Sequence, residues 1–195
     1  MQITTYPRAR RRRQWLLETT LWKSSRVYST RASARSCPLR FFSMMIGIIS
    51  DTHGLLRPEA VEALRGSQHI IHAGDIGAPA IISSLEEIAP VTAIHGNADR
   101  EPWKRKFPET SVVELAGLHF YVIHDVNALD LKPQAAGFAA VISGHSHQPK
   151  QETRDGVLYF NPGAAGPRRF KLPITVGRIE IDAGGMVARV IELLK

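Results

Sequence analysis

The stretch IGIISDTHG, residues 46–54, decides the class of fold. Its first part is a short apolar run with no alternating polar face, which is typical of a strand buried on both faces. The run then breaks at Asp51 and His53 into a turn that contains a glycine. Two later stretches repeat this layout, because IIHAGD ends in Asp75 and VTAIHGNAD ends in Asn97 and Asp99. The sequence therefore predicts polar, metal-binding side chains at the ends of short buried strands.

Helical patterns lie between these strands. The segment 58–66 begins with a proline, has apolar residues at helical spacing and ends at a glycine, and the segment 79–89 also has proline in its first turn. Strand and helix units that alternate in this way favour a mainly parallel sheet in an α/β domain.

The second half has a different pattern. Residues 110–117 and 118–125 are typical of a hairpin that turns near Ala116–Gly117, and Asp155–Gly156 marks a second hairpin. The segment FAAVISG, residues 138–144, predicts another buried strand, and residues 172–181 and 185–194 predict two closing strands. We expect this half to be largely antiparallel and to form a second sheet that packs against the first. The sequence indicates no linker after residue 44, so residues 44–195 are predicted to form one domain.

Charge is distributed unevenly along the 195 residues. The chain carries 25 Lys and Arg against 18 Asp and Glu, a net charge of +7. Residues 1–43 contain nine Arg and one Lys but only one acid, Glu18, which leaves residues 44–195 with a net charge of −2. All eight His lie in that second part. The basic balance therefore belongs to the first segment, and nucleic-acid binding by the domain is not expected.

The segment 1–43 is rich in Arg and Ser and shows no sustained hydrophobic periodicity. It has no apolar stretch long enough for a membrane span or a secretory signal, and no membrane partner is expected. Three interpretations remain open: a disordered tail or sequence upstream of a start at Met44–Met45, an organelle transit peptide, or a basic nucleic-acid-binding arm. The only cysteine, Cys37, also lies here, so the domain has no disulfide or thiolate site, which suits a reducing, cytoplasmic compartment.

The candidate site gathers oxygen and imidazole donors from strand ends, where open α/β sheets bind ligands. In VISGHSH, residues 141–147, two histidines lie two positions apart on a short turn, so each ring can serve a different ion. Such donors without thiolates suit manganese, iron, cobalt, nickel or zinc. Ions about 3.5–4 Å apart need a shared carboxylate, and Asp75 is the candidate bridge. The full polar set is Asp51, His53, Asp75, Asn97, Asp99, His124, Asp125, His145 and His147.

The motifs DTHG, HAGD, GN-x-D, a strand-end His, GHSH and NPG occur in the order seen in the calcineurin-like metallophosphoesterase superfamily. Residues 45–195 most resemble its small YfcE-type bacterial and archaeal phosphodiesterases. The resemblance implies a four-layer αββα sandwich of two mixed sheets, with a dinuclear metal site at the carboxyl ends of the strands. It also implies two divalent ions, manganese first among them, and attack on a small phosphate ester by a hydroxide that bridges the ions.

Each site residue takes an expected role from this resemblance. Asp51, His53 and His147 would bind the first ion, Asp75 would bridge, and a second set would bind the other ion. The second set is Asn97, His124 and His145. Asp75, Asn97 and His124 are also the expected catalytic group, together with Asp99, which we expect to hold a ligand or a loop. The remaining histidines are expected to be structural or peripheral: His69, His72, His95 and His119.

Three positions depart from the family pattern. Ala98 replaces a histidine that many relatives carry within GN-x-D, Asp125 replaces a glycine after His124, and Ala164 replaces a frequent serine. Asp125 is expected either to orient His124 or to face solvent. Arg168 and Arg169 are expected either to meet a substrate phosphate or to lie in a solvated turn. A protein-interaction scaffold of the retromer-subunit type is the alternative function, and the physiological substrate and a homo-oligomeric state stay open.

Overall fold

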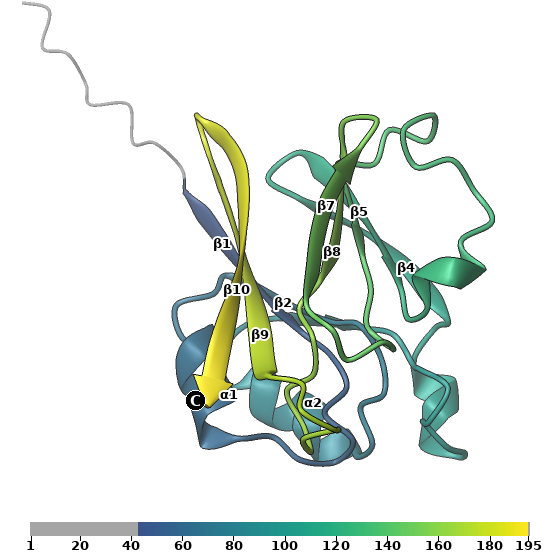
Figure 1. Cartoon of the computed structure of the whole chain (residues 1–195), viewed down its shortest axis with the longest axis vertical. Coiled ribbons are helices and arrows are strands. Elements are labelled where there is room, and N and C mark those ends of the chain that lie inside the picture. Colours follow the sequence, from purple (N-terminus) through teal and green to yellow (C-terminus); the bar gives the residue numbers. More distant parts are fainter. Residues whose placement is uncertain (1–42, 195) are drawn as a thin grey trace, which may run out of the picture. The chain divides into compact units, whose positions relative to one another are not determined.

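The computed structural model describes residues 43–194, except for the side chain of Trp103 (Figure 1). The predicted basic segment 1–43 therefore lies outside the described residues, apart from Ser43. Each predicted strand and helix of residues 44–194 is present, with boundaries close to those expected. In chain order, the elements are β1 Met44–Ile49, α1 Pro58–Leu64, β2 His69–His72, α2 Pro79–Glu86, β3 Val91–Ala93, the 3₁₀ helix η1 Trp103–Lys106, β4 Thr110–Leu115, β5 Leu118–Ile123, the 3₁₀ helix η2 Val126–Ala128, β6 Ala140–Ile142, β7 Lys150–Arg154, β8 Val157–Asn161, β9 Ile174–Asp182 and β10 Gly185–Leu194.

The strands form two mixed sheets. The first has the order β10-β9-β1-β2-β3, in which β1, β2 and β3 are parallel and β9 runs antiparallel to β1. The second has the order β4-β5-β6-β8-β7, in which β5, β6 and β8 are parallel and the two edge strands are antiparallel. The predicted class, an α/β fold of two mixed sheets, is confirmed.

The expected content of the second sheet was wrong in two respects. The closing hairpin β9–β10 belongs to the first sheet, where Met44 of β1 pairs with Ile181 of β9. In addition, the centre of the second sheet is parallel, not antiparallel. The physical reason is that a hairpin pattern shows only that two neighbouring strands pair with each other. It carries no information about the third strand against which the hairpin packs.

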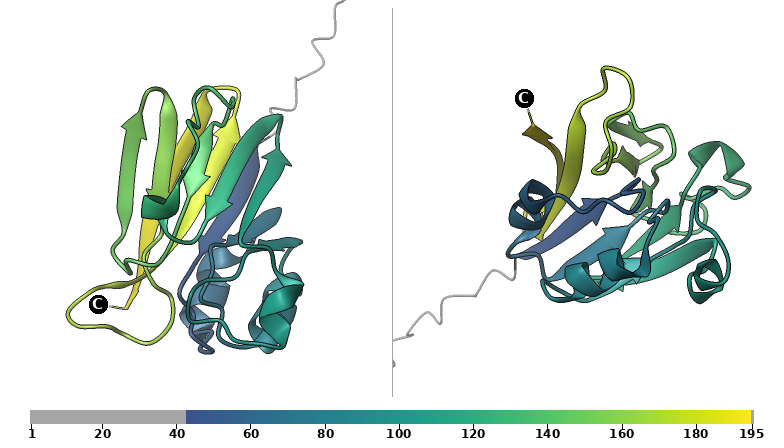
Figure 2. Two further views of the ribbon diagram at one scale, coloured as in Figure 1. Left: turned by 90° about the vertical axis from the view of Figure 1, so that its right-hand side faces the viewer. Right: turned by 90° about the horizontal axis from the view of Figure 1, so that it is seen from below.

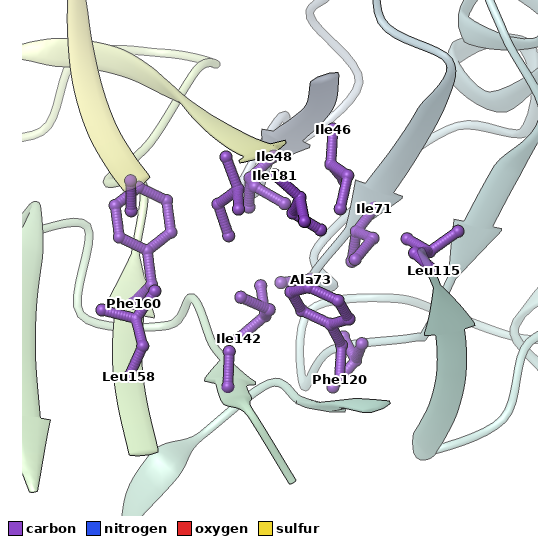
Figure 3. Packing of buried hydrophobic residues seen from close by; sticks show 14 of the residues in the cluster. Ile46, Ile48, Ile71, Ala73, Leu115, Phe120, Ile142, Leu158, Phe160 and Ile181 are labelled. Atoms are coloured by element: carbon purple, nitrogen blue, oxygen red, sulfur yellow. The ribbon is translucent and has the colours of Figure 1, made fainter. Parts of the chain in front are cut away.

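Apolar side chains from both sheets meet in the core between them (Figure 3). Ile48 and Ile71 of the first sheet pack there with Phe120, Ile142 and Phe160 of the second. Gly177 of β9 leaves space for the ring of Phe160, since a Cβ at this position would lie 2.3 Å from Cε1. The two sheets therefore form the inner layers of a sandwich.

Other segments cover the outer faces of the two sheets. Helices α1 and α2, each beginning with a proline, lie beside the strands of the first sheet (Figure 2). Their side chains Leu64 and Leu85 are buried in a cluster with Ile49 and Val176 of that sheet. The segment that runs from η2 to residue 138 packs Leu131 and Phe138 against Tyr121 on the outside of the second sheet. This arrangement positions the carboxyl ends of β1, β2, β3, β5 and β6 at one edge of the sandwich. No helix in residues 43–194 is both long and apolar enough to cross a membrane.

Candidate metal centre

All seven predicted ligand positions lie just beyond strand ends, where the chain turns out of a sheet. Loops after β1, β2 and β3 supply four of them from the first sheet, and loops after β5 and β6 supply three from the second. Because parallel strands end at the same edge, residues nearly 100 positions apart become neighbours. The residues that meet are Asp51, His53, Asp75, Asn97, His124, His145 and His147.

A first group of donors combines Asp51, His53 and His147. Asp51 Oδ1 lies 3.2 Å from His147 Nε2, and the Nε2 atoms of His53 and His147 lie 3.3 Å apart. The two imidazole rings stack with their centroids 5.2 Å apart. Two ring nitrogens and a carboxylate oxygen thus converge on one point, as the ligands of a single cation do.

A second group lies around His124. Its Nε2 atom is 3.1 Å from Asn97 Oδ1 and 3.4 Å from Asp75 Oδ2, and Asn97 Oδ1 is also 3.0 Å from His145 Nδ1. Asp75 Oδ2 reaches the first group as well, because it lies 3.7 Å from His53 Nε2. Asp75 is therefore placed between the two groups, where a bridging ligand is needed. Asp51 is also within reach of both groups, which the sequence did not suggest.

The hydrogen bonds leave an excess of acceptors that a cation would satisfy. His124 Nδ1 donates to the carbonyl oxygen of Ala73 at 2.7 Å, so in the neutral ring the Nε2 lone pair faces the oxygens of Asp75 and Asn97. Only the protonated ring can donate a hydrogen bond from Nε2 to Asp75. Asp51 Oδ1 is buried and accepts no hydrogen bond from any described residue. A buried carboxylate oxygen without a partner is energetically unfavourable in the absence of a cation. The donor set therefore fits divalent ions that accept both imidazole and carboxylate.

The pKa shifts of the acidic and imidazole groups in the centre also indicate a site that attracts a cation. Burial would raise the pKa of Asp75, but the hydrogen bonds from His124 and from the Ala98 N–H lower it to about 2. Burial would lower the pKa of His124, but its bonds to Asp75 and Ala73 raise it. For His53 burial prevails and the pKa is lowered, which keeps the imidazole neutral as a ligand must be. The centre thus holds carboxylate charge and attracts positive charge.

The backbone of the site is unusual and was not predicted. Five of the candidate ligand residues have φ between 46° and 67°, the left-handed region that few residues other than glycine adopt. Backbone bonds between loops hold these turns, with Asp51 N–H donating to Gly74 O at 3.0 Å and His53 N–H to Asp75 O at 2.9 Å. Such strain persists where the surrounding structure enforces it, and it is concentrated at functional sites. The five residues are Asp51, His53, Asp75, His145 and His147.

Two polar side chains fasten the loops without reaching the ligand groups. The carboxylate of Asp99 accepts from the N–H groups of Gly77 and Gly96 at 2.8 and 2.9 Å, which joins the loop after β2 to the loop after β3. Asn161, for which the NPG motif alone suggested no role, donates to Gly144 O at 2.6 Å and accepts from Gly163 N–H at 2.8 Å. These contacts give both residues a positioning role.

The Asp125 carboxylate lies beside His145, and not beside the ring of His124, although orienting His124 was one of its two expected roles. One of its oxygens accepts from the Asn127 N–H at 2.9 Å, and the other is 3.8 Å from His145 Nε2. His124 is oriented by a backbone carbonyl instead. Cavities of about 480 Å³ and about 270 Å³ flank this pair, and His95 lines the larger one.

Three of the other histidines make contacts outside the two ligand groups. His69 and His72 bond to the hydroxyl groups of Thr92 and Thr52 at 2.8 and 3.0 Å. His119 is half exposed and lies 3.7 Å from Glu114. These positions agree with the structural or peripheral roles expected of them.

The protein-family model described as the calcineurin-like phosphoesterase superfamily domain matches residues 44–184 of the sequence. The chain belongs to this superfamily. It is 34% identical over 161 residues to a "probable metallophosphoesterase" of Methanothermobacter thermautotrophicus, an alignment that covers 76% of this chain and 92% of the relative. The family expected from the motifs is therefore confirmed.

Solved structures support the same fold. A structure described as a novel archaeal phosphodiesterase has a TM-score of 0.66 and 30% identity, covering 77% of this chain and all of that one. Vacuolar protein sorting 29 of Cryptosporidium parvum has a TM-score of 0.63 at 17% identity, covering 79% of this chain and all of that one. At this low identity the second likeness concerns the fold alone.

Proposed function

We propose that this superfamily member is a phosphodiesterase that depends on two divalent ions, with manganese as the preferred ion. One ion would be held by Asp51, His53 and His147, the other by a second set of ligands, and Asp75 would contact both. The second set is Asn97, His124 and His145. The observation that carries the proposal is the convergence of seven competent donors in two linked groups, together with a buried Asp51 oxygen that no described residue satisfies. Bound there, the ions would supply a nucleophile from water and neutralise charge on the phosphoryl oxygens.

The chain itself would keep the donors in place. The Ala98 N–H donates to Asp75 Oδ1 at 2.7 Å, so Oδ2 stays directed at His53 and His124. Ser50 donates from its hydroxyl to Asp51 Oδ2 at 2.7 Å, which directs Oδ1 toward His147. Each carboxylate thus has one oxygen anchored and the other free to bind an ion.

A scaffold function is the second candidate, because a vacuolar sorting protein has the same fold. A scaffold has no need for a complete ligand set, whereas all seven positions are filled here by side chains of types that can bind metal. Completeness therefore favours the enzyme.

The direct test is hydrolysis of bis(p-nitrophenyl) phosphate by the full chain loaded with manganese. We expect turnover that stops on addition of a chelator and returns with manganese. Asp75→Asn should abolish turnover, and His119→Gln should leave it unchanged because His119 lies away from the centre. A manganese-loaded chain that cleaves no phosphodiester would favour the scaffold.

The alanine at position 98 predicts that the rate of hydrolysis depends on the basicity of the leaving group. General acid catalysis is worth about 10²–10⁴-fold, and position 98 lacks the imidazole that many relatives carry there. Aryl phosphodiesters should therefore be cleaved readily and alkyl esters slowly. Ala98→His should raise turnover of alkyl esters more than that of aryl esters, and equal increases for both would contradict this reasoning.

A further inference from the structure

An arginine from the NPG loop reaches the mouth of the metal centre. Arg169 Nη2 lies 3.5 Å from His53 Nε2, the atom through which His53 joins the first group of donors. The Arg169 side chain is otherwise exposed, and no carboxylate of residues 43–194 forms an ion pair with it. A cation bound at His53 Nε2 would occupy the ring lone pair that this guanidinium contacts. The N–H groups of Arg169, which are exposed to solvent, would then be available to an anionic ligand at the metal centre.

The loop that carries Arg169 is fastened to the metal centre. Ala165 and Gly166 donate their N–H groups to the carbonyl oxygens of Ser50 and Asp51 at 3.1 and 3.2 Å. Gly166 fits only because it lacks a side chain, since a Cβ there would be 2.2 Å from Thr52 O. Arg57 adds two hydrogen bonds from its guanidinium to Gly166 O, each of 3.3 Å. The start of the loop is thus tied to the same turn that carries Asp51 and His53.

A tight turn fixes the far side of Arg169. The Leu172 N–H donates to Arg169 O at 3.2 Å, and Phe170 between them has a φ of 54° and is 92% exposed. A left-handed conformation is unfavourable for a bulky residue, and the backbone bond from Leu172 to Arg169 closes the turn in which Phe170 adopts it. Arg169 therefore projects from a defined backbone position.

We propose that Arg169 binds a phosphoryl oxygen of the substrate while the metal centre holds the others. This role rests on the proposed phosphodiesterase function and assigns it a substrate-binding residue. A guanidinium presents several N–H donors in a plane and bonds phosphate oxygens with charge assistance. Arg169 would add positive charge where negative charge accumulates on the phosphoryl group.

Arg168 provides a matched control within the same loop. It has the same side chain and is also exposed, but no hydrogen bond or ion pair links it to the metal centre among the described residues. A general effect of positive charge would involve both arginines equally. A specific contact would involve Arg169 alone.

The test is the dissociation constant of inorganic phosphate for the manganese-loaded full chain, measured by titration calorimetry together with the number of manganese ions bound. Arg169→Ala should weaken phosphate binding about 10- to 100-fold, the range expected for a hydrogen bond to a charged group. Arg169→Lys should recover part of the affinity, and Arg168→Ala should change it less than about twofold. Manganese binding should remain unchanged in all three variants.

Three results would overturn the proposal: unchanged phosphate affinity in Arg169→Ala, an equal loss in Arg168→Ala, or loss of manganese from Arg169→Ala. Phosphate binding requires no turnover, so this role and the proposed function fail separately. If the chain binds phosphate through Arg169 but cleaves no diester, the role of Arg169 stands and the proposed phosphodiesterase function is wrong. If Arg169→Ala hydrolyses the diester with the kcat/KM of the unmodified chain, the phosphodiesterase function stands and the role of Arg169 is wrong.

Discussion

The core between the sheets and the edge that carries the ligands follow opposite rules of construction. In the core, Ile48, Phe120, Ile142 and Phe160 are fully or almost fully buried on extended strands whose backbone groups are paired. At the edge, five polar residues adopt left-handed backbone conformations, and the Asp51 carboxylate is buried with one oxygen unpaired. The first region is arranged for stability and the second for binding.

This difference shows where the free energy of folding comes from and where it is lost. Buried apolar surface in the core stabilises the folded chain, at roughly 25 cal/mol per Å². Each left-handed residue other than glycine is unfavourable by an amount on the order of 1 kcal/mol, and the unpaired carboxylate adds to this. Changes in the core should therefore alter stability and leave metal affinity unchanged. Changes at the edge should alter metal affinity with little loss of stability.

The largest effect on stability is expected for Phe160→Ala. The ring is 1% exposed and packs against Gly177 across the two sheets, so its removal leaves a cavity. Substitutions of this kind reduce the free energy of unfolding by about 3–5 kcal/mol. Denaturant titration of the metal-free protein measures the loss. Manganese affinity of the folded variant should stay unchanged, and a large decrease would show that the core and the edge are not independent.

A somewhat smaller loss of stability is expected when the pH is lowered, because His72 is buried. This histidine is fully buried, and burial lowers its pKa to about 4 from the ordinary value of 6.5. The unfolded chain therefore takes up a proton below pH 6.5 that the folded chain refuses. Stability should fall as the pH falls from 6.5 to about 4, by about 3 kcal/mol from this residue. Asp75 affects stability at lower pH. Because its pKa is lowered from 3.8 to about 2, its contribution is complete above pH 3.8 and is lost as the pH falls from 3.8 to about 2.

Denaturant titrations at pH 7 and pH 4.5 in the presence of a chelator measure this loss. His72→Leu should reduce the difference between the two pH values, while His119→Gln should retain it because His119 is half exposed. An equal pH dependence in the unmodified chain and in His72→Leu would exclude His72 as its source.

The smallest change in stability is expected for Asp51→Asn. An amide keeps an oxygen for the Ser50 hydroxyl and for the His145 N–H, and it removes the buried charge on Oδ1. The metal-free variant should unfold within about 1 kcal/mol of the unmodified chain, or be more stable. Manganese binding should nevertheless be lost or greatly weakened. A variant that is strongly destabilised without metal would show that Asp51 has a structural function.

The strands and the ligand positions could be predicted because both depend on local patterns. A short apolar run such as IGIIS has few alternatives to a buried strand, and polar residues just beyond it must lie at the sheet edge. Asp51, Asp75 and His145 were located on this basis alone. The Asp155–Gly156 hairpin was equally local.

The remaining features depend on contacts between distant segments. The position of β9 beside β1 follows from packing of Ile179 and Ile181 against the second sheet, which no hairpin pattern reveals. The left-handed backbone of Asp51 and His53 is held by hydrogen bonds to the loop after β2, and not by the preferences of the two residues themselves. The link from Arg57 to Gly166 joins residues 109 positions apart.

The central claim is that the edge of the sandwich holds two ions that share Asp75. Elemental analysis of the manganese-loaded full chain, after removal of free metal, tests it directly. The unmodified chain should retain two ions, Asn97→Ala and His147→Ala should each weaken mainly one, and Asp75→Ala should retain neither. Two ions retained by Asp75→Ala, or no ion bound by the unmodified chain, would contradict the account.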